Sequence, residues 1–301
     1  MKSTRREFLR TAAAATALTA GCATPPRPPA MARPLVGTQL FGWGQYYQRD
    51  GKKLADHHPE VLSAVRDCGY DYAEASLNLD RPEDSVHFAE LAKAKGLGVT
   101  CFYTGPALHE PQAAYQAITQ ILSAARAVKP FGTQVINCNP KPIGREKTDE
   151  ELQAQARALT QLGKGLNELG LKLGVHNHTP EMKNGAREFH HNFLATPPEH
   201  VGFCFDVHWV YRGGVPPLEA MIDYGERVVS WHLRQSREGI WWEDLAFGDI
   251  DYGMVAVYAR ANRLAEIYTV ELALESGTKI TRSVVENHRR SREYVRRVFK
   301  A

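Results

Sequence analysis

Residues 171–181 read LKLGVHNHTPE, and this stretch carries the pattern on which the fold prediction rests. A short apolar run over residues 171–175 ends in two histidines, His176 and His178, and Glu181 follows three residues later. A run of that length bounded by polar residues predicts a buried parallel strand. The stretch therefore indicates a strand whose carboxyl end carries side chains suited to metal binding or proton transfer.

The same arrangement recurs three times in the second half of the chain. Asp206 and His208 follow the run VGFCF, His232 and Arg234 follow RVVSW, and Glu271 follows IYTV. In a barrel of parallel strands the carboxyl ends converge on one face, and active sites lie there. The sequence therefore predicts a mixed nitrogen and oxygen site for one divalent metal ion, either Mn, Zn, Co or Mg.

Strand-like and helix-like segments alternate from residue 35 to the end, which favours a parallel sheet with helical crossovers. Expected strands cover 35–41, 70–76, 97–103, 133–138, 171–176, 200–206, 227–234 and 267–272. Expected helices cover 56–68, 82–95, 111–128, 149–169, 186–194, 216–225, 251–264 and 278–299. Eight such units predict an α/β fold, a (β/α)8 TIM barrel that forms a single domain over residues 34–301.

The first 33 residues are expected to be a targeting segment and a tether. Arg5 and Arg6 precede an apolar run that reaches Ala20, and this pattern resembles a twin-arginine (Tat) export signal. LTAGC, ending at Cys22, resembles a lipoprotein cleavage box, although its leucine lies four residues before the cysteine instead of three. A lipidated membrane anchor and ordinary signal cleavage both remain open. The proline-rich residues 24–29 predict an extended tether, and the expected location is periplasmic or extracytoplasmic.

Charge and cysteine content narrow the class of protein. The chain has 37 basic and 34 acidic residues, and four of the basic and one of the acidic residues lie among the first 21. Residues 22–301 therefore hold 33 basic and 33 acidic residues, a net charge of zero. A chain with no net charge has no general attraction for nucleic acid, so no nucleic-acid partner is expected.

The cysteines beyond Cys22 show no paired spacing and are expected to be buried free thiols; they are Cys68, Cys101, Cys138 and Cys204.

Three of the strand-end residues are expected to be metal ligands. Asp206, His232 and Glu271 each occupy the last or nearly the last position of a strand. Buried carboxylates that lie close together need a cation or bound protons. The ligand from the fifth strand stays open between Glu181, which we favour, and His176, which otherwise contacts the substrate or supports a ligand.

Aromatic residues gather near the same strand ends and are candidates for contact with a sugar ring. Tryptophan presents a flat apolar face with one polar atom, which suits the C–H face of a pyranose. The candidates are Trp43, Tyr103, Trp209, and Trp241 or its neighbour Trp242. Ordinary packing is the alternative for each of them. Glu74, at the end of the second strand, is expected to bind a substrate hydroxyl or to form an ion pair inside the barrel.

The order and spacing of five motifs resemble the xylose-isomerase-like barrel superfamily, in particular an exported branch with an HNHxxE strand. The motifs are HNHTPE (176–181), FDVHWVYRGGVPP (205–217), WHLRQ (231–235), FGDIDY (247–252) and VEL (270–272). The superfamily groups sugar phosphate isomerases and epimerases, inosose dehydratases and endonuclease-IV-like enzymes, and the branch includes enzymes acting on 3-keto sugars and 3-keto glycosides. The resemblance implies metal ligands at Glu181, Asp206, His232 and Glu271.

One departure from the family pattern concerns the residues after His232. The usual sequence is His-Leu-Lys-Asp, whereas here Arg234 and Gln235 follow Leu233, which keeps a cation and replaces the acidic residue by an amide. The exact reaction is therefore left open by the sequence.

The resemblance implies a metal-dependent isomerase, epimerase or carbon–oxygen lyase that removes a proton next to the carbonyl of an oxidised sugar. Candidate acid–base groups are His178, His208 and Glu271, and Arg234 is expected to stabilise a developing oxyanion. Two rivals remain: a dehydratase or hydrolase of a polyol, and a sugar-binding lipoprotein without activity. DNA repair is disfavoured by the neutral charge and the export signal.

Overall fold

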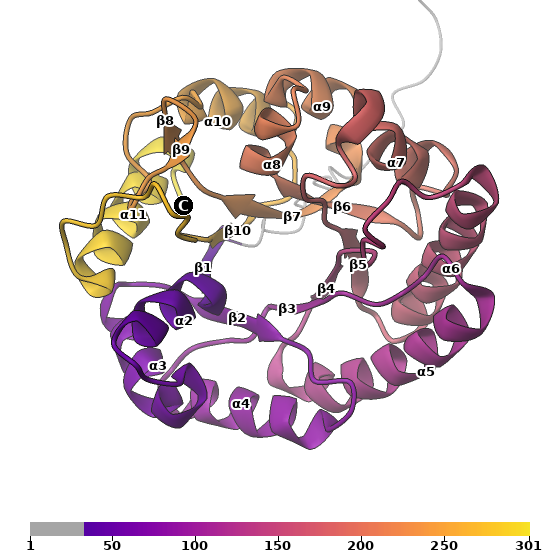
Figure 1. The fold of residues 1–301 in the computed structure, drawn as a ribbon. Coiled ribbons are helices and arrows are strands. Elements are labelled where there is room, and N and C mark those ends of the chain that lie inside the picture. Colours follow the sequence, from indigo (N-terminus) through magenta and orange to yellow (C-terminus); the bar gives the residue numbers. More distant parts are fainter. Residues whose placement is uncertain (1–32) are drawn as a thin grey trace, which may run out of the picture. The chain divides into compact units, whose positions relative to one another are not determined.

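Eight parallel strands close into a barrel in the computed structural model, which describes residues 33–301 as one compact unit (Figure 1). The order around the barrel is β1, β10, β7, β6, β5, β4, β3, β2, and β2 pairs with β1 again. The strands are β1 (Leu35–Gln39), β2 (Tyr72–Ser76), β3 (Cys101–Thr104), β4 (Val135–Cys138), β5 (Lys172–Val175), β6 (Gly202–Asp206), β7 (Val228–Leu233) and β10 (Ile267–Val270). The predicted (β/α)8 barrel is confirmed.

A ring of helices surrounds the barrel (Figure 1). Local side chains determine where several of these helices begin. Helix α6 begins with a capping box between Thr148 and Glu151. Helices α4 and α5 each begin with a proline, which lacks the N–H group that would have no partner in the first turn of a helix. The expected helices are α3 (His58–Asp67), α4 (Pro82–Ala94), α5 (Pro111–Val128), α6 (Asp149–Glu168), α7 (Lys183–Leu194), α9 (Pro217–Tyr224), α10 (Tyr252–Ala261) and α11 (Val284–Phe299).

Three features were not expected from the sequence, and all lie at the carboxyl ends of strands. Helix α2 (Leu40–Arg49) follows β1 without a loop, and α8 (Val207–Arg212) follows β6 in the same way. A short hairpin of β8 (Ser236–Arg237) and β9 (Ile240–Trp241) lies in the long segment after β7. Helices α2 and α8 begin directly at the end of a strand, so no turn residues mark the change, and the hairpin strands have only two residues each.

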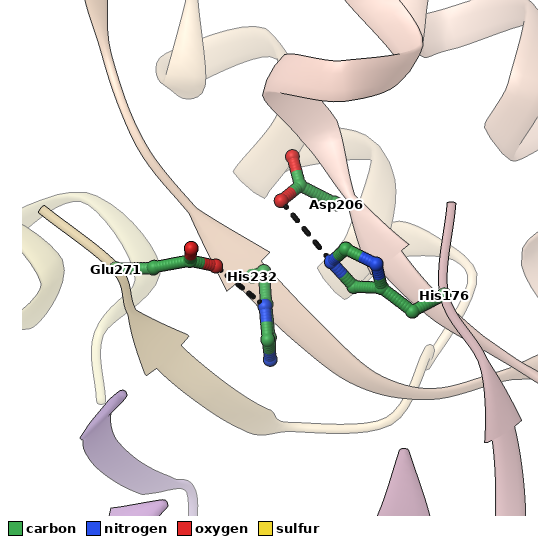
Figure 2. A group of neighbouring side chains, drawn as sticks. All are labelled: His176, Asp206, His232 and Glu271. Atoms are coloured by element: carbon green, nitrogen blue, oxygen red, sulfur yellow. Dashed lines mark hydrogen bonds and ion pairs between the residues drawn. The ribbon is translucent and has the colours of Figure 1, made fainter. Parts of the chain in front are cut away.

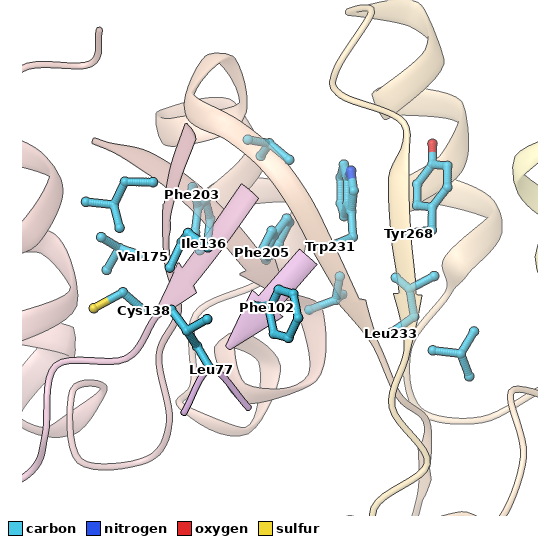
Figure 3. Close-up of a cluster of buried hydrophobic side chains, with 14 of the residues drawn as sticks. Leu77, Phe102, Ile136, Cys138, Val175, Phe203, Phe205, Trp231, Leu233 and Tyr268 are labelled. Carbon is cyan, nitrogen blue, oxygen red and sulfur yellow. The ribbon is translucent and has the colours of Figure 1, made fainter. Parts of the chain in front are cut away.

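The main hydrophobic core lies between the strands and the surrounding helices. Figure 3 shows outward-facing residues such as Phe203, Phe205 and Trp231, all of them buried. Phe203 packs on Phe193 of α7, and Tyr268 packs on α11 through ring contacts of about 5 Å. This alternation leaves every second strand residue to fill the barrel interior.

The barrel interior carries a layer of polar side chains that are fully buried. Asn137 accepts a hydrogen bond from Ser230 (2.8 Å) and donates to Glu74 (3.2 Å), and Thr269 donates to the same carboxylate (3.3 Å). Gly174 leaves room for this layer, because a Cβ there would lie 2.5 Å from the Asn137 side-chain oxygen. The layer supports the side chains at the strand ends above it.

The four cysteines between Cys68 and Cys204 are free and buried, which confirms that prediction. Arg5, Arg6 and Cys22, with the expectations of export and lipidation, lie outside the described residues. Among residues 33–301, no helix combines the length and the apolar character needed to cross a bilayer.

Candidate metal centre

Four buried side chains meet at the carboxyl ends of adjacent strands (Figure 2). They are His176, Asp206, His232 and Glu271, and one ligand atom from each lies within 4.8 Å of the others. Bonds of roughly 2.0–2.2 Å to a central ion place ligand atoms at most about 4.4 Å apart, so a small contraction brings all four onto one cation.

Strand register brings these residues together. Asp206 of β6 is paired directly with His232 of β7, and His232 lies opposite Thr269 of β10, two residues before Glu271. Asp206 is further fixed as the cap of α8, where its Oδ1 accepts a hydrogen bond from the backbone of Trp209 at 2.8 Å. The second carboxylate oxygen of Asp206 remains directed at the cluster.

Both carboxylates of the cluster are ionised because of nearby positive charge. Burial alone would raise the pKa of Glu271, but Arg234 and His232 lower it to about 2. Burial would also raise the pKa of Asp206, but Arg234 and His176 hold it below the usual range of a carboxyl. Arg234 lies 3.2 Å from an oxygen of each carboxylate. The site thus presents anionic oxygens.

His176 has one ring nitrogen held and one free. Its Nδ1 lies 3.3 Å from the side-chain oxygen of Asn139, an acceptor, so Nδ1 carries the proton. Its Nε2 is buried without a hydrogen-bond partner among the described residues, although it lies 3.4 Å from Asp206. Buried polar atoms are normally paired. The unpaired nitrogen therefore has the orientation of a metal ligand.

Glu181, the favoured fifth-strand ligand, lies outside this cluster. Strand β5 ends at Val175, and the turn after it folds the Glu181 carboxylate back onto the backbone N–H of His178 at 2.8 Å. Its other oxygen accepts from Asn139 at 3.3 Å, and burial raises its pKa. Glu181 thus orients Asn139, which in turn orients His176, so the structure places His176, and not Glu181, within the four-residue cluster.

His232 is held between two carboxylates. Its Nδ1 lies 2.8 Å from Glu271, and its Nε2 lies 3.0 Å from Glu74. Burial would lower the pKa of His232, but Cys204 and these carboxylates raise it well above the ordinary value. Glu74 is completely buried and forms the ion pair inside the barrel that was the alternative to a contact with a substrate hydroxyl.

The donor set suits a divalent cation. Two imidazoles and two carboxylates form a mixed nitrogen and oxygen site of the kind used by Mn, Zn and Co. The unpaired His176 nitrogen and the Asn139 and Glu74 contacts behind the two histidines match the way outer partners orient metal ligands.

A cavity of about 380 Å³ opens directly onto the cluster. Tyr103, Trp209 and Trp241 line it, as the sequence predicted for sugar-contacting aromatics. Trp43 does not: it is buried in the core and stacks on His288 with ring centroids 4.5 Å apart. The structure thus places Trp43 apart from the cavity lining, and its contact with a sugar ring stays a prediction.

Trp242, the alternative to Trp241, also lies outside the cavity lining. The guanidinium carbon of Arg237 lies over its ring, 3.8 Å from the ring centroid.

The two candidate basic histidines differ in their access to this cavity. His178 lines it and is half-buried, and burial together with His176 lowers its pKa to about 3. His208 is completely buried and does not line it; burial and Arg234 lower its pKa to about 4. The structure places His208 behind Trp209 and Trp241, outside the cavity lining, and its direct catalytic role stays a prediction.

Arg234 lines the cavity, and its guanidinium carbon lies over the Trp241 ring, 4.1 Å from the ring centroid. The neighbouring Gln235, which departs from the family pattern, organises the loop after β7. Its side chain accepts from the backbone of Ser236 and Ile250 and donates to the carbonyls of Ala246 and Ile250. The amide thus builds the loop that carries Trp241.

Sequence reasoning missed Asn139, Gln39, Gln45 and Phe41. Asn139 comes directly after the fourth strand, so its position at a strand end was a usable signal. Gln39 also ends a strand, whereas Phe41 and Gln45 belong to helix α2, which the sequence did not reveal.

The chain belongs to the Xylose isomerase-like TIM barrel family. The family model matches residues 62–297. An inosose dehydratase of Lacticaseibacillus casei is 25% identical over 214 residues, which are 67% of this chain and 71% of that protein.

Solved structures show the same fold. A sugar phosphate isomerase/epimerase from Parabacteroides distasonis superposes with a TM-score of 0.70 at 19% identity, covering 89% of this chain and 95% of that one. The 3-keto-D-glucoside 4-epimerase of E. coli superposes with a TM-score of 0.62 at 14% identity, covering 88% of this chain and 100% of that one. The fold is thus that of sugar isomerases and epimerases.

Proposed function

We propose that this protein is a divalent-metal-dependent isomerase, epimerase or lyase that removes a proton next to the carbonyl of an oxidised (3-keto) sugar or glycoside. The observation that carries the proposal is the four-residue cluster of His176, Asp206, His232 and Glu271 at the base of an aromatic-lined cavity. A bound cation supplies polarisation of the substrate carbonyl, which acidifies the neighbouring C–H bond.

His178 is the proposed general base. It is the cavity histidine outside the four-residue cluster, and its low pKa keeps the ring unprotonated at neutral pH. A free imidazole nitrogen accepts the proton from the carbon next to the carbonyl.

Three buried N–H donors are suited to hold the substrate oxygens. Arg234 Nε, Trp209 Nε1 and Trp241 Nε1 have no hydrogen-bond partner within residues 33–301. Donors that are already fixed in a dry site stabilise negative charge as it develops on a carbonyl oxygen. Arg234 combines such a donor with a positive charge, so it is the proposed partner of that oxygen.

The fate of the carbanion distinguishes the outcomes. Return of the proton on the opposite face gives an epimer, return at the neighbouring carbon moves the carbonyl, and loss of a β substituent gives an elimination. The similarity to an inosose dehydratase favours elimination of water as the second candidate. A sugar-binding protein without activity remains the rival that needs no metal.

We expect the purified protein to bind about one divalent ion per chain and, once loaded, to exchange a sugar proton for deuterium. The reason is that the cation site and His178 face one cavity. Elemental analysis after dialysis measures the metal, and NMR of methyl 3-keto-glucoside in D₂O measures the exchange.

Chelation is the control, and it should abolish the exchange. Exchange alone, epimer formation and loss of the methoxyl group are separate signals in the same spectra. A protein that binds none of Mn, Zn, Co and Ni would contradict the metal assignment, and metal binding without any exchange would favour the non-catalytic rival.

We also propose that the chain is exported through the twin-arginine route, with a membrane tether at Cys22 or release after cleavage. Replacing Arg5 and Arg6 together with lysine should block export of a reporter fusion, because the guanidinium pair cannot be mimicked by ammonium groups. Fractionation of periplasm and cytoplasm measures the result, and equal export of the variant would refute this route. Cys22→Ser separately tests the tether through membrane partitioning.

A further inference from the structure

A second cavity of about 630 Å³ adjoins the metal cavity. The two cavities share part of their lining, namely Gln39, Phe41, Gln45 and Tyr103. The second cavity extends from this shared wall between α2, the segment after it, and the start of α4. Ligand sites usually fall between about 300 and 1,000 Å³. Each cavity is therefore large enough to hold a separate part of one ligand.

The lining of both cavities is poorly suited to a phosphate group. The second cavity is lined by no lysine or arginine of residues 33–301, and it includes Asp84. In the metal cavity the lining arginine is Arg234, which already contacts Asp206 and Glu271. Phosphates are normally bound by free arginine or lysine side chains. Within the described part of the chain, Arg234 is the one lysine or arginine in either lining, and its charge is shared with the carboxylates of Asp206 and Glu271.

The helix ends at the second cavity do not replace those missing cations. Helix α2 begins next to Gln39, whose side-chain oxygen already accepts from the Phe41 N–H. Helix α4 carries Glu83 and Asp84 in its first turn. Helix amino termini attract anions through free N–H groups and through the helix dipole. At α2 the Gln39 oxygen already binds one of these N–H groups, and at α4 the two carboxylates repel an anion.

Neutral and apolar groups fit the second cavity better. Its wall contains Leu40, Leu54 and Phe88, and Phe41 at the shared wall is 56% exposed although it is a large aromatic residue. Because the oxygen of Gln39 is used by the helix, its amide NH₂ remains as a donor where the cavities meet. An exposed aromatic face beside a neutral donor suits a glycosidic oxygen that carries an apolar or aromatic group.

We propose that the substrate is an uncharged glycoside: the oxidised sugar lies in the metal cavity, and an apolar or aromatic aglycone occupies the second cavity. This inference rests on the proposed function, of which it specifies the substrate class. It places the bond between sugar and aglycone at the wall formed by Gln39, Phe41 and Tyr103.

Calorimetric titration of the metal-loaded protein tests this arrangement with three stable probes: phenyl β-glucopyranoside, methyl β-glucopyranoside and glucose 6-phosphate. We expect the phenyl glucoside to bind at least about 10-fold more tightly than the methyl glucoside, because the ring buries apolar surface. Glucose 6-phosphate should bind no more tightly than the methyl glucoside.

A tryptophan at Ala55 should fill the second cavity, since Ala55 is exposed and lines it. In Ala55→Trp the preference for the phenyl probe should disappear while the affinity for the methyl probe stays unchanged. The matched control is Ala261→Trp, which places the same side chain at an exposed position outside both linings. This control should keep the full preference.

The glycoside proposal is overturned if glucose 6-phosphate binds most tightly, if the phenyl preference is absent, or if it survives in Ala55→Trp. Deuterium exchange separates this result from failure of the proposed function. A phenyl preference that is lost in Ala55→Trp, in a protein that exchanges no proton of any 3-keto sugar, would support the second cavity and refute only the chemistry.

Discussion

In the His178→Asn protein, deuterium exchange into methyl 3-keto-glucoside is expected to be about 10²–10⁴-fold slower than in the wild type, with metal affinity nearly unchanged. His178 lines the cavity but lies outside the four-residue cluster, so it meets the substrate and not the cation. Asparagine keeps a polar side chain of similar reach and removes the basic nitrogen. Exchange rates from NMR and metal affinity from titration are measured on the same preparation.

His87→Asn is the matched control, because His87 is exposed on α4 and lines neither cavity. It should exchange at the wild-type rate. If His178→Asn instead loses its metal, His178 is a ligand; if it retains both metal and exchange, another group removes the proton.

His176→Gln should weaken metal binding by more than about 100-fold. This exceeds the effect of about 10- to 100-fold that is usual for residues that only orient a ligand, because the substitution removes a ligand nitrogen. The unpaired Nε2 of His176 lies in the cluster, whereas Glu181 reaches it only through Asn139. Titration with Mn or Zn against a competing chelator gives the affinities.

Glu181→Gln is the informative comparison and should lose less than about 10-fold, since an amide oxygen still accepts one of the two hydrogen bonds made by Glu181. Melting curves show whether either variant is merely unfolded. The opposite ranking, with a large loss in Glu181→Gln and a small one in His176→Gln, would restore the ligand set that the family resemblance implied.

The barrel was predictable because its strands are short apolar runs separated by segments of helical length. The run before Asp206, for example, occurs as a strand ending at that residue. Helix α8 was hidden because the same Asp206 that ends the strand also caps the helix, leaving no loop to mark the change. Alternation along a strand reveals which residues are buried, but it does not reveal the conformation of the chain beyond the last strand residue.

The candidate site was predictable where strand register decides it. Asp206, His232 and Glu271 lie near the ends of neighbouring strands, and parallel pairing places them together. Beyond β5 the chain turns, and no periodic rule shows that Glu181 folds back onto His178. Trp43 likewise needed the direction of α2, which the sequence alone did not provide.

The buried polar layer beneath the cluster has a consequence for the resistance of this protein to heat. Barrels of this type are usually filled by branched apolar side chains, whereas Glu74, Asn137 and Ser230 fill this one and orient His232. Replacing them with well-packed apolar residues is a common route to a more stable core. Selection for thermostability alone would therefore tend to remove the support of His232, so greater thermostability and the proposed chemistry place opposite demands on these positions.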